Sequence, residues 1–183
     1  PYLIDSNDTI VLKRSRPISN VPEMQFGNMA NDGGHLIIEE KELNLFLEKE
    51  PKAREFIRVL LGSDEFLYSK ARYCLWLTDI KPNQLRELKE VQKRVELVKN
   101  NREKSSRNAT KKLANTPYLF GEIRQPDTDY LLIPRVTSEN RKYVPIGYVD
   151  KSIIVTDRCA FIPEANIFIF GIITSEMHQT WLR

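Results

Sequence analysis

The stretch "YLLIPRVTSENRKYVPIGYV" (Tyr130–Val149) decides the fold class. Its two flanks, Tyr130–Val136 and Tyr143–Val149, are rich in β-branched and aromatic residues, which favour strands. The middle, "TSENRK", is polar, and Ser and Asn are typical turn residues because they hydrogen-bond to their own backbone. The pattern therefore predicts two neighbouring strands joined by a polar connection.

More short strands are predicted around this pair, and a helix closes the chain. Ser175 is placed to cap that helix, which we expect over residues 174–183. Five further segments have the composition or the short apolar run of a strand, namely Thr9–Arg14, Arg72–Asp79, Tyr118–Gln125, Ser152–Thr156 and Ile167–Ile173. The β-rich part is expected at about residues 116–173.

Helical spacing dominates the earlier part, about residues 37–115. One helix begins near Glu40, and a second begins at Pro51, followed by apolar residues spaced through Leu60. The clearest helix runs from Pro82 to about Lys104, with an apolar stripe of Leu85, Leu88, Val91, Val95 and Val98. We predict an α+β fold of one domain, with a helical N-terminal half packed on a mixed or antiparallel β-sheet in the C-terminal half.

Composition sets limits on location and metal binding. The chain has 183 residues, 41% of them hydrophobic and 29% charged, which is typical of a globular domain. It has no apolar run of eighteen residues and no signal peptide, so we expect no membrane partner and a cytoplasmic location. Cys74, Cys159, His35 and His178 are too dispersed to predict a disulfide or a metal site. Because the chain begins at Pro1 rather than Met, we expect it to be part of a longer protein.

Positive charge is concentrated in the middle of the chain. Residues 51–124 contain 17 basic and 9 acidic residues, whereas residues 1–50 contain 5 and 9. Such a segment suits a polyanion partner, although a solvated helix face explains the same composition. The predicted phosphate contacts are Lys93, Lys99, Arg102, Lys104, Arg107, Lys111 and Lys112, with Lys142 added from the polar connection.

The motifs of common enzymes do not occur in the sequence. There is no GxGxxG, P-loop, GxSxG, HExxH or CxxC pattern. Glu122 and Glu139 have no feature that pairs them for acid–base work. We therefore predict no catalytic, cofactor-binding or metal residues in this chain.

Two polar clusters carry the side chains that read base edges in duplex DNA. Arg pairs with guanine, Gln or Asn with adenine, and Glu with cytosine. The predicted readout residues are Glu122, Arg124, Gln125, Arg135, Ser138, Glu139 and Arg141. Alternation with apolar Leu119, Ile123, Leu132 and Val136 would place the polar side chains on the opposite, outer face. The alternative is that both clusters are hydrogen-bonded turns with surface ion pairs.

Several ordered blocks resemble one family. They are "VPEMQFGNMANDGGHLII", "FIRVLLGSDEFLYSKARYCLWL", "KRVELVKNNREKSS", "FGEIRQP", "YLLIPRVTSENRKYVPIGYVDKSIIVTD" and "FGIITSEMHQTWLR". Across nearly the whole chain they are similar to the target-recognition domain of MmeI-like adenine DNA methyltransferases, which are single-chain restriction–modification proteins. The resemblance implies sequence-specific recognition of double-stranded DNA.

The resemblance also implies a partner in the same polypeptide. That partner is a methyltransferase domain that uses S-adenosylmethionine to methylate an adenine rotated out of the stack. The family's NPP[YF] motif and its glycine-rich cofactor motif are absent from these residues, so we expect the isolated chain to be catalytically inert. The alternative is a non-catalytic interaction or scaffold domain with a basic helix.

Overall fold

The strands among the described residues form two four-stranded sheets. The computed structural model describes residues 13–14 and 17–182. The first sheet has the order β1-β8-β5-β6, and all its pairs are antiparallel. The second has the order β2-β4-β3-β7 and is mixed, because β3 and β7 are parallel. The first sheet comprises β1 (Gln25–Phe26), β5 (Tyr130–Pro134), β6 (Gly147–Val149) and β8 (Cys159–Pro163), and the second β2 (Ile37–Glu39), β3 (Ile57–Leu61), β4 (Arg72–Leu75) and β7 (Ile154–Val155).

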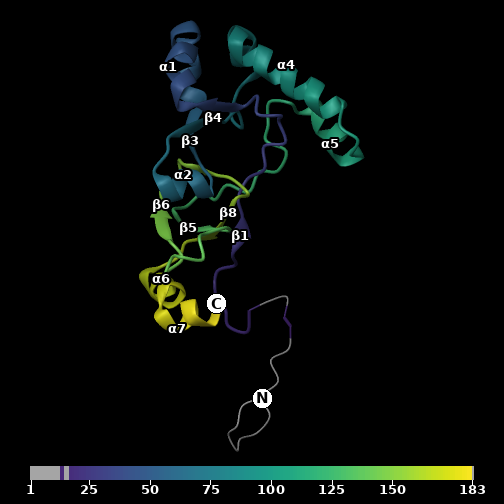
Figure 1. Cartoon of the computed structure of the whole chain (residues 1–183). Coiled ribbons are helices and arrows are strands. Elements are labelled where there is room, and N and C mark those ends of the chain that lie inside the picture. The colour runs from purple at the N-terminus through teal and green to yellow at the C-terminus, as the bar shows by residue number, and fades with distance from the viewer. Residues whose placement is uncertain (1–12, 15–16, 183) are drawn as a thin grey trace, which may run out of the picture.

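Apart from α2, which lies in the middle of the molecule, the helices lie at its two ends with the sheets between them (Figure 1). At one end, α1 and α4 lie beside the second sheet, and at the other end α6 and α7 lie beside the first. The elements are α1 (Glu40–Lys49), η1 (Pro51–Phe56), α2 (Ser63–Tyr68), α3 (Pro82–Glu87), α4 (Lys89–Glu103), α5 (Asn108–Lys112), η2 (Leu113–Asn115), α6 (Ile167–Thr174) and α7 (Glu176–Leu182).

The α+β class is confirmed, as is the strand pair predicted from the opening stretch. Tyr130 pairs with Val149 and Leu132 with Gly147 in an antiparallel register. The helix near Glu40 and the strand beginning at Arg72 are also present. Ser175 caps the closing helix, because its Oγ accepts from the backbone N–H of His178 at 3.2 Å. The predicted strand Thr9–Arg14 falls for the most part outside the described residues.

Three local predictions are wrong. Ile167–Ile173 is not a strand but lies in helix α6, which Asn166 caps by accepting from Ile169 N–H at 3.0 Å. The helix predicted from Pro51 through Leu60 ends at Phe56, and the chain continues as strand β3. Tyr118–Gln125 is not a regular strand, since only Glu122 forms a bridge, opposite Met29. Short apolar runs do not distinguish helix from strand without their tertiary partners.

The long amphipathic helix is interrupted at one residue. Leu88 has φ −96° and ψ 82°, which separates α3 from α4. The Gln92 side chain bridges the interruption by donating to the Leu85 carbonyl at 2.8 Å. The free N–H of Glu90 donates to the carboxylate of Glu50 at 2.7 Å, from the end of α1. At the break the Leu88 side chain packs into the core, where it is 2% exposed. The hydrogen bond from Glu90 to Glu50 satisfies one of the backbone N–H groups that the start of α4 leaves without a partner in the helix.

Three hydrophobic clusters hold these layers together. The largest packs the second sheet against α1, α3 and α4, and it includes the stripe residues Val91, Val95 and Val98. Strand β5 is buried on both faces. Its alternate residues Tyr130 and Leu132 face the α2 side, whereas Leu131 faces α6. Full burial of each such side chain contributes roughly 1.5–3 kcal/mol, so β5 is a central anchor of the fold.

Two of the crossings that the chain makes between the sheets lie at adjacent positions. Gly27–Met29 leads from β1 towards β2, and Thr156–Arg158 leads from β7 to β8. The two crossings are paired by a parallel bridge between Asn28 and Thr156. A Cβ atom at Gly27 would lie 2.3 Å from the Thr156 carbonyl oxygen, so glycine is required there by close approach of the backbones. We call Gly27–Met29, Glu122–Gln125 and Val155–Arg158 together the junction.

Candidate nucleic-acid interface

Asn28 is the centre of the junction. It is 1% exposed. Its side-chain amide donates to the Gln125 carbonyl oxygen at 2.9 Å and to the Val155 backbone carbonyl at 2.8 Å. Its own side-chain oxygen accepts from the Arg124 backbone N–H at 2.7 Å. One buried side chain therefore fixes three segments that lie far apart in the sequence.

Gln125 serves the junction rather than its surface. Its Nε2 donates to the backbone carbonyls of Ile153 at 2.7 Å and Lys151 at 3.1 Å. Its Oε1 accepts from Asn28 and, at 3.3 Å, from the backbone N–H of Val155. Both ends of the amide are therefore engaged within the protein. Adenine readout by Gln125, as predicted, would require these hydrogen bonds to break.

Arg124 is half-buried at the edge of the junction and forms an ion pair with Glu122. Its Nη1 also donates to the Gly27 carbonyl at 3.1 Å. The guanidinium side chain remains 36% exposed and the Glu122 carboxylate 42% exposed. The two predicted readout residues thus form one unit that orients the guanidinium while leaving part of it open to a ligand.

Arg135 is held against an aromatic ring. Its guanidinium lies 4.5 Å from the centroid of the Phe26 ring, and its Nη1 donates to the Asp157 carbonyl at 2.9 Å. Arg135 remains exposed. Stacking and the hydrogen bond limit its rotamers, so this predicted readout residue is placed beside the second crossing of the junction.

The predicted polar connection is an exposed turn. The backbone N–H of Arg141 donates to the Ser138 carbonyl at 3.1 Å, and Ser138 Oγ accepts from Asn140 N–H at 3.2 Å. Ser138 therefore serves the turn, while Glu139 is exposed beside it. Lys142 lies 3.9 Å from the Glu176 carboxylate and over the Tyr143 ring. A concavity of about 590 Å³ is lined by this turn together with Val144 and Gln179.

The outer-face argument for readout holds only in part. Leu132 is buried, as expected, but Ile123 is 44% exposed and Val136 is 71% exposed. The predicted alternation fails because residues 118–125 are irregular and β5 ends at Pro134. Hydrogen bonds of the junction, rather than strand pleating, orient Arg124 and Arg135.

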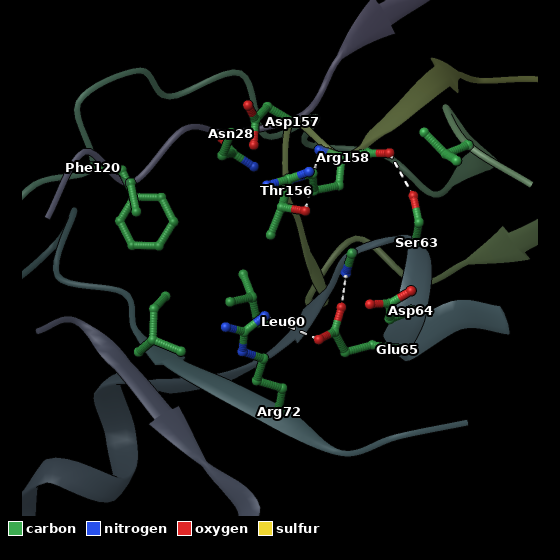
Figure 2. Close-up of a pocket in the computed structure, with 14 residues that line it drawn as sticks. Asn28, Leu60, Ser63, Asp64, Glu65, Arg72, Phe120, Thr156, Asp157 and Arg158 are labelled. Carbon is green, nitrogen blue, oxygen red and sulfur yellow. Dashed lines mark hydrogen bonds and ion pairs between the residues drawn. The ribbon is translucent and has the colours of Figure 1, made fainter. Parts of the chain in front are cut away.

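A cleft of about 490 Å³ opens between the sheets beside the junction (Figure 2). Thr156, Asp157 and Arg158 line it together with Asn28, and Phe120 and Leu60 contribute apolar wall. The charged groups in it are Asp64, Glu65, Arg72, Asp157 and Arg158. Both hydrogen-bond donors and acceptors are therefore available in one concave site.

One acidic side chain of the cleft, Glu65, has its partners within the protein. Glu65 accepts from the Gly62 backbone N–H at 2.8 Å and pairs with Arg72 at 3.0 Å. Ser63 Oγ donates to the Arg158 carbonyl at 2.6 Å, which ties α2 to the second crossing (Figure 2). No sequence pattern indicated a site at Thr156, Asp157 and Arg158. Their one local signal was a polar turn after a strand, and nothing in the sequence linked it to Asn28.

The most basic part of the chain, residues 93–112, lies mainly on α4 and α5, and we call it the basic segment. Lys93 and Lys99 have side chains 69% and 54% exposed, and they pair with Glu90 and Glu103 on the same helix. The remaining predicted contacts on this segment, apart from Arg102, are exposed, namely Lys104, Arg107, Lys111 and Lys112. Exposed cations on adjoining helices can approach a polyanion without rearrangement of the fold.

Arg102 is wrong as a predicted phosphate contact. It is 0% exposed, and its guanidinium donates to five backbone carbonyls, all within 3.0 Å. The acceptors are Ala30, Asn31, Leu113, Thr116 and Leu119. Burial lowers the pKa of this guanidinium, an effect that Asp32 opposes. Because an arginine has five N–H donors, no donor is left for a ligand.

The described residues include neither a metal-ligand cluster nor a membrane-spanning helix. Among the residues that the structure describes, no group of three His, Cys, Asp or Glu side chains is arranged to hold a metal ion. No helix within those residues is long and apolar enough to cross a membrane. Cys74 and Cys159 are buried free thiols, and burial raises the pKa of Cys159 to about 11.

Comparison with known proteins gives consistent matches. DNA methyltransferase A of Bacillus subtilis (strain 168) is 37% identical over 183 residues, which are 100% of this chain and 21% of that protein. A solved structure of the type IIL restriction–modification enzyme MmeI in complex with DNA superposes with a TM-score of 0.92 and 41% identity, covering 99% of this chain and 24% of that one. The chain thus spans about a fifth to a quarter of the length of these relatives.

A family model describes the same region. The model of the MmeI target recognition domain matches residues 5–183, which is nearly the entire chain. The match includes both sheets, the junction, the basic segment and the closing helices. The chain therefore belongs to the MmeI target recognition domain family.

Proposed function

We propose that this chain is the sequence-specific double-stranded DNA recognition module of a longer adenine DNA methyltransferase of the restriction–modification type. The observation that carries the proposal is the likeness, at 41% identity and a TM-score of 0.92 over 99% of the chain, to an enzyme solved in complex with DNA. A TM-score of 0.92 over 99% of the chain means that the two proteins share one backbone fold, which supports a DNA-binding role for this chain.

The geometry supports two kinds of DNA contact, made by different residues of the module. Exposed Lys93, Lys99, Lys104, Lys111 and Lys112 suit phosphates, which fix position without reading sequence. The oriented guanidiniums of the junction suit guanine edges, since a bidentate arginine pair recognises O6 and N7 together. Carboxylates near them suit the amino group of cytosine. A polar site with both kinds of group discriminates bases better than a uniformly basic one.

The catalytic step belongs to another part of the polypeptide in this proposal. A methyltransferase domain would bind S-adenosylmethionine and accept the adenine rotated out of the duplex. The residues of this chain would grip and orient the flanking base pairs. We propose a cytoplasmic location for the whole protein.

Selection from a pool of random duplexes tests the proposal. The longer polypeptide should enrich one short motif, and the Arg124→Ala variant should lose preference at one position while keeping the rest. Lys52→Gln is the control, because Lys52 is exposed and lies outside the predicted contact set. Retention of duplexes without any common motif would contradict sequence-specific recognition.

A further inference from the structure

We propose that the outer side of α6 and α7 docks on an apolar surface of another domain of the same, longer polypeptide. We call this side the outer face, and it consists of Ile167, Phe168, Ile172, Met177 and Trp181. Each of the five is between 49% and 83% exposed. The inference rests on the proposed function in one respect, which is that the chain works within a longer protein.

Helix α6 is apolar on two opposite sides. Ile169, Phe170 and Ile173 pack inward on Leu131 and Ile162 of the first sheet. At about 100° per residue, Ile167, Phe168 and Ile172 fall on the other side of the same helix. A helix that is hydrophobic all round is typical of a buried position, yet only the inner side of α6 is covered.

Helix α7 extends the same character. Met177 and Trp181 are four residues apart, so they lie on one stripe, and both are at least 80% exposed. Together the five side chains expose on the order of several hundred Å², the size at which exposed apolar patches mark interaction sites. An interface between domains of one chain buries a comparable area on each partner.

The charge of this segment determines what can cover it. Residues 165–182 contain one charged residue, Glu176, although 29% of the whole chain is charged. Glu176 lies 3.9 Å from Lys142 Nζ at the edge of the first sheet. A surface without cations does not attract a phosphate backbone. The outer face therefore adjoins the predicted phosphate contact Lys142, but its own five side chains are apolar and suit an apolar partner.

A domain of the same polypeptide fits better than a membrane or a second copy. Helices that lie on membranes carry Lys and Arg on their polar side, and residues 165–182 contain neither. The matched region is 21% and 24% of the length of the two relatives, so about three-quarters to four-fifths of each of those chains lies outside it. A covalently linked domain is present at high effective concentration, which makes a patch of modest area sufficient for stable docking.

Thiol labelling in the full polypeptide tests this proposal without DNA. The variant Met177→Cys places a thiol on the outer face, and Tyr68→Cys places one at exposed Tyr68, near the C-terminal end of α2. The native thiols of this chain are buried and give little background. The Met177→Cys thiol should react with a maleimide about tenfold more slowly than the Tyr68→Cys thiol, because it reacts only when the domains separate. Equal rates would overturn the proposal.

A second variant tests whether slow labelling of the Met177→Cys thiol is caused by docking of the outer face. Adding Phe168→Gln and Trp181→Gln to Met177→Cys should restore the labelling rate to that of the control, and the sedimentation coefficient of the protein should not change. Protection that disappears on dilution together with a dimer would assign the outer face to a second copy and overturn the proposal. Because no DNA is present, these results do not depend on sequence recognition, which the duplex selection measures separately.

Discussion

Nη2 of Arg102 donates a hydrogen bond of 2.7 Å to the backbone carbonyl of Leu119, and the same nitrogen donates to Ala30 at 3.0 Å. One buried guanidinium thus connects helix α4 to two parts of the junction. Ala30 directly follows Gly27–Met29, and Leu119 lies shortly before Glu122–Gln125. This relationship explains why the densest basic segment of the sequence contains a cation that is structural. It also leads to the first prediction.

Arg102→Ala should lower the free energy of unfolding by roughly 3–5 kcal/mol, because it leaves several buried carbonyls unpaired. Arg102→Lys should recover little of this loss, since an ammonium has three donors rather than five. Lys99→Gln, on the exposed side of the same helix, should change stability by less than about 0.5 kcal/mol. Denaturant titration of the three variants measures the difference. A loss of DNA affinity at unchanged stability would restore Arg102 as a phosphate contact.

Gln125→Ala should destabilise the protein by about 1–3 kcal/mol without altering the preferred DNA sequence. The reason is that Asn28, Ile153 and Val155 each lose a hydrogen-bond partner inside the junction. Thermal unfolding and duplex selection on the same preparation provide the two measurements. Altered base preference in a variant of normal stability would show that Gln125 reads a base.

Arg124→Ala or Arg141→Ala should relax the choice at one base position by roughly tenfold to a hundredfold, which corresponds to one bidentate contact of about 1–3 kcal/mol. Methylation sequencing of the full polypeptide carrying each single change measures this. We expect the larger effect at Arg124, because Glu122 and Gly27 hold its guanidinium in place. Glu122→Gln is the matched variant, and it should weaken the same position less. Loss of stability with an unaltered target would identify these arginines as structural ion pairs.

Changing Lys104, Lys111 and Lys112 together to Gln should weaken binding to all duplexes alike. The slope of log affinity against log salt should flatten by about one unit per lost phosphate contact. Fluorescence anisotropy at several salt concentrations provides the slope. The triple variant differs from Arg102→Ala in keeping its stability, because all three side chains are exposed. An unchanged slope would identify the segment as a solvated helix face.

The stability of the fold should decrease as pH rises from about 9 to about 11. Burial raises the pKa of Cys159 from 9.0 to about 11, so in this interval the unfolded chain releases the thiol proton while the folded chain retains it. Because the folded state then binds more protons, raising the pH favours unfolding. Cys159→Ala should show a flatter profile in denaturant titrations over this range. The same dependence in both proteins would show that other groups cause the decrease.

The sequence by itself determined the features that repeat along the chain. The stripe from Leu85 to Val98 predicted an amphipathic helix, and the β-branched flanks of residues 130–149 predicted a strand pair. These predictions succeeded because periodicity records which side of an element faces the core. The family resemblance was also carried by the sequence, since its blocks extend over nearly the whole chain.

The tertiary structure alone decided which individual side chains are buried and which hydrogen bonds they form. Arg102 and Lys104 are two residues apart in one basic segment, yet the first is 0% exposed and the second is exposed. The apolar run at Ile167 became a helix because Asn166 caps it and the first sheet receives its inner side. The junction unites Asn28, Gln125 and Val155 from segments 97 and 127 residues away from Asn28. Burial and hydrogen bonding between distant segments depend on where the chain folds back, and local sequence does not encode that position.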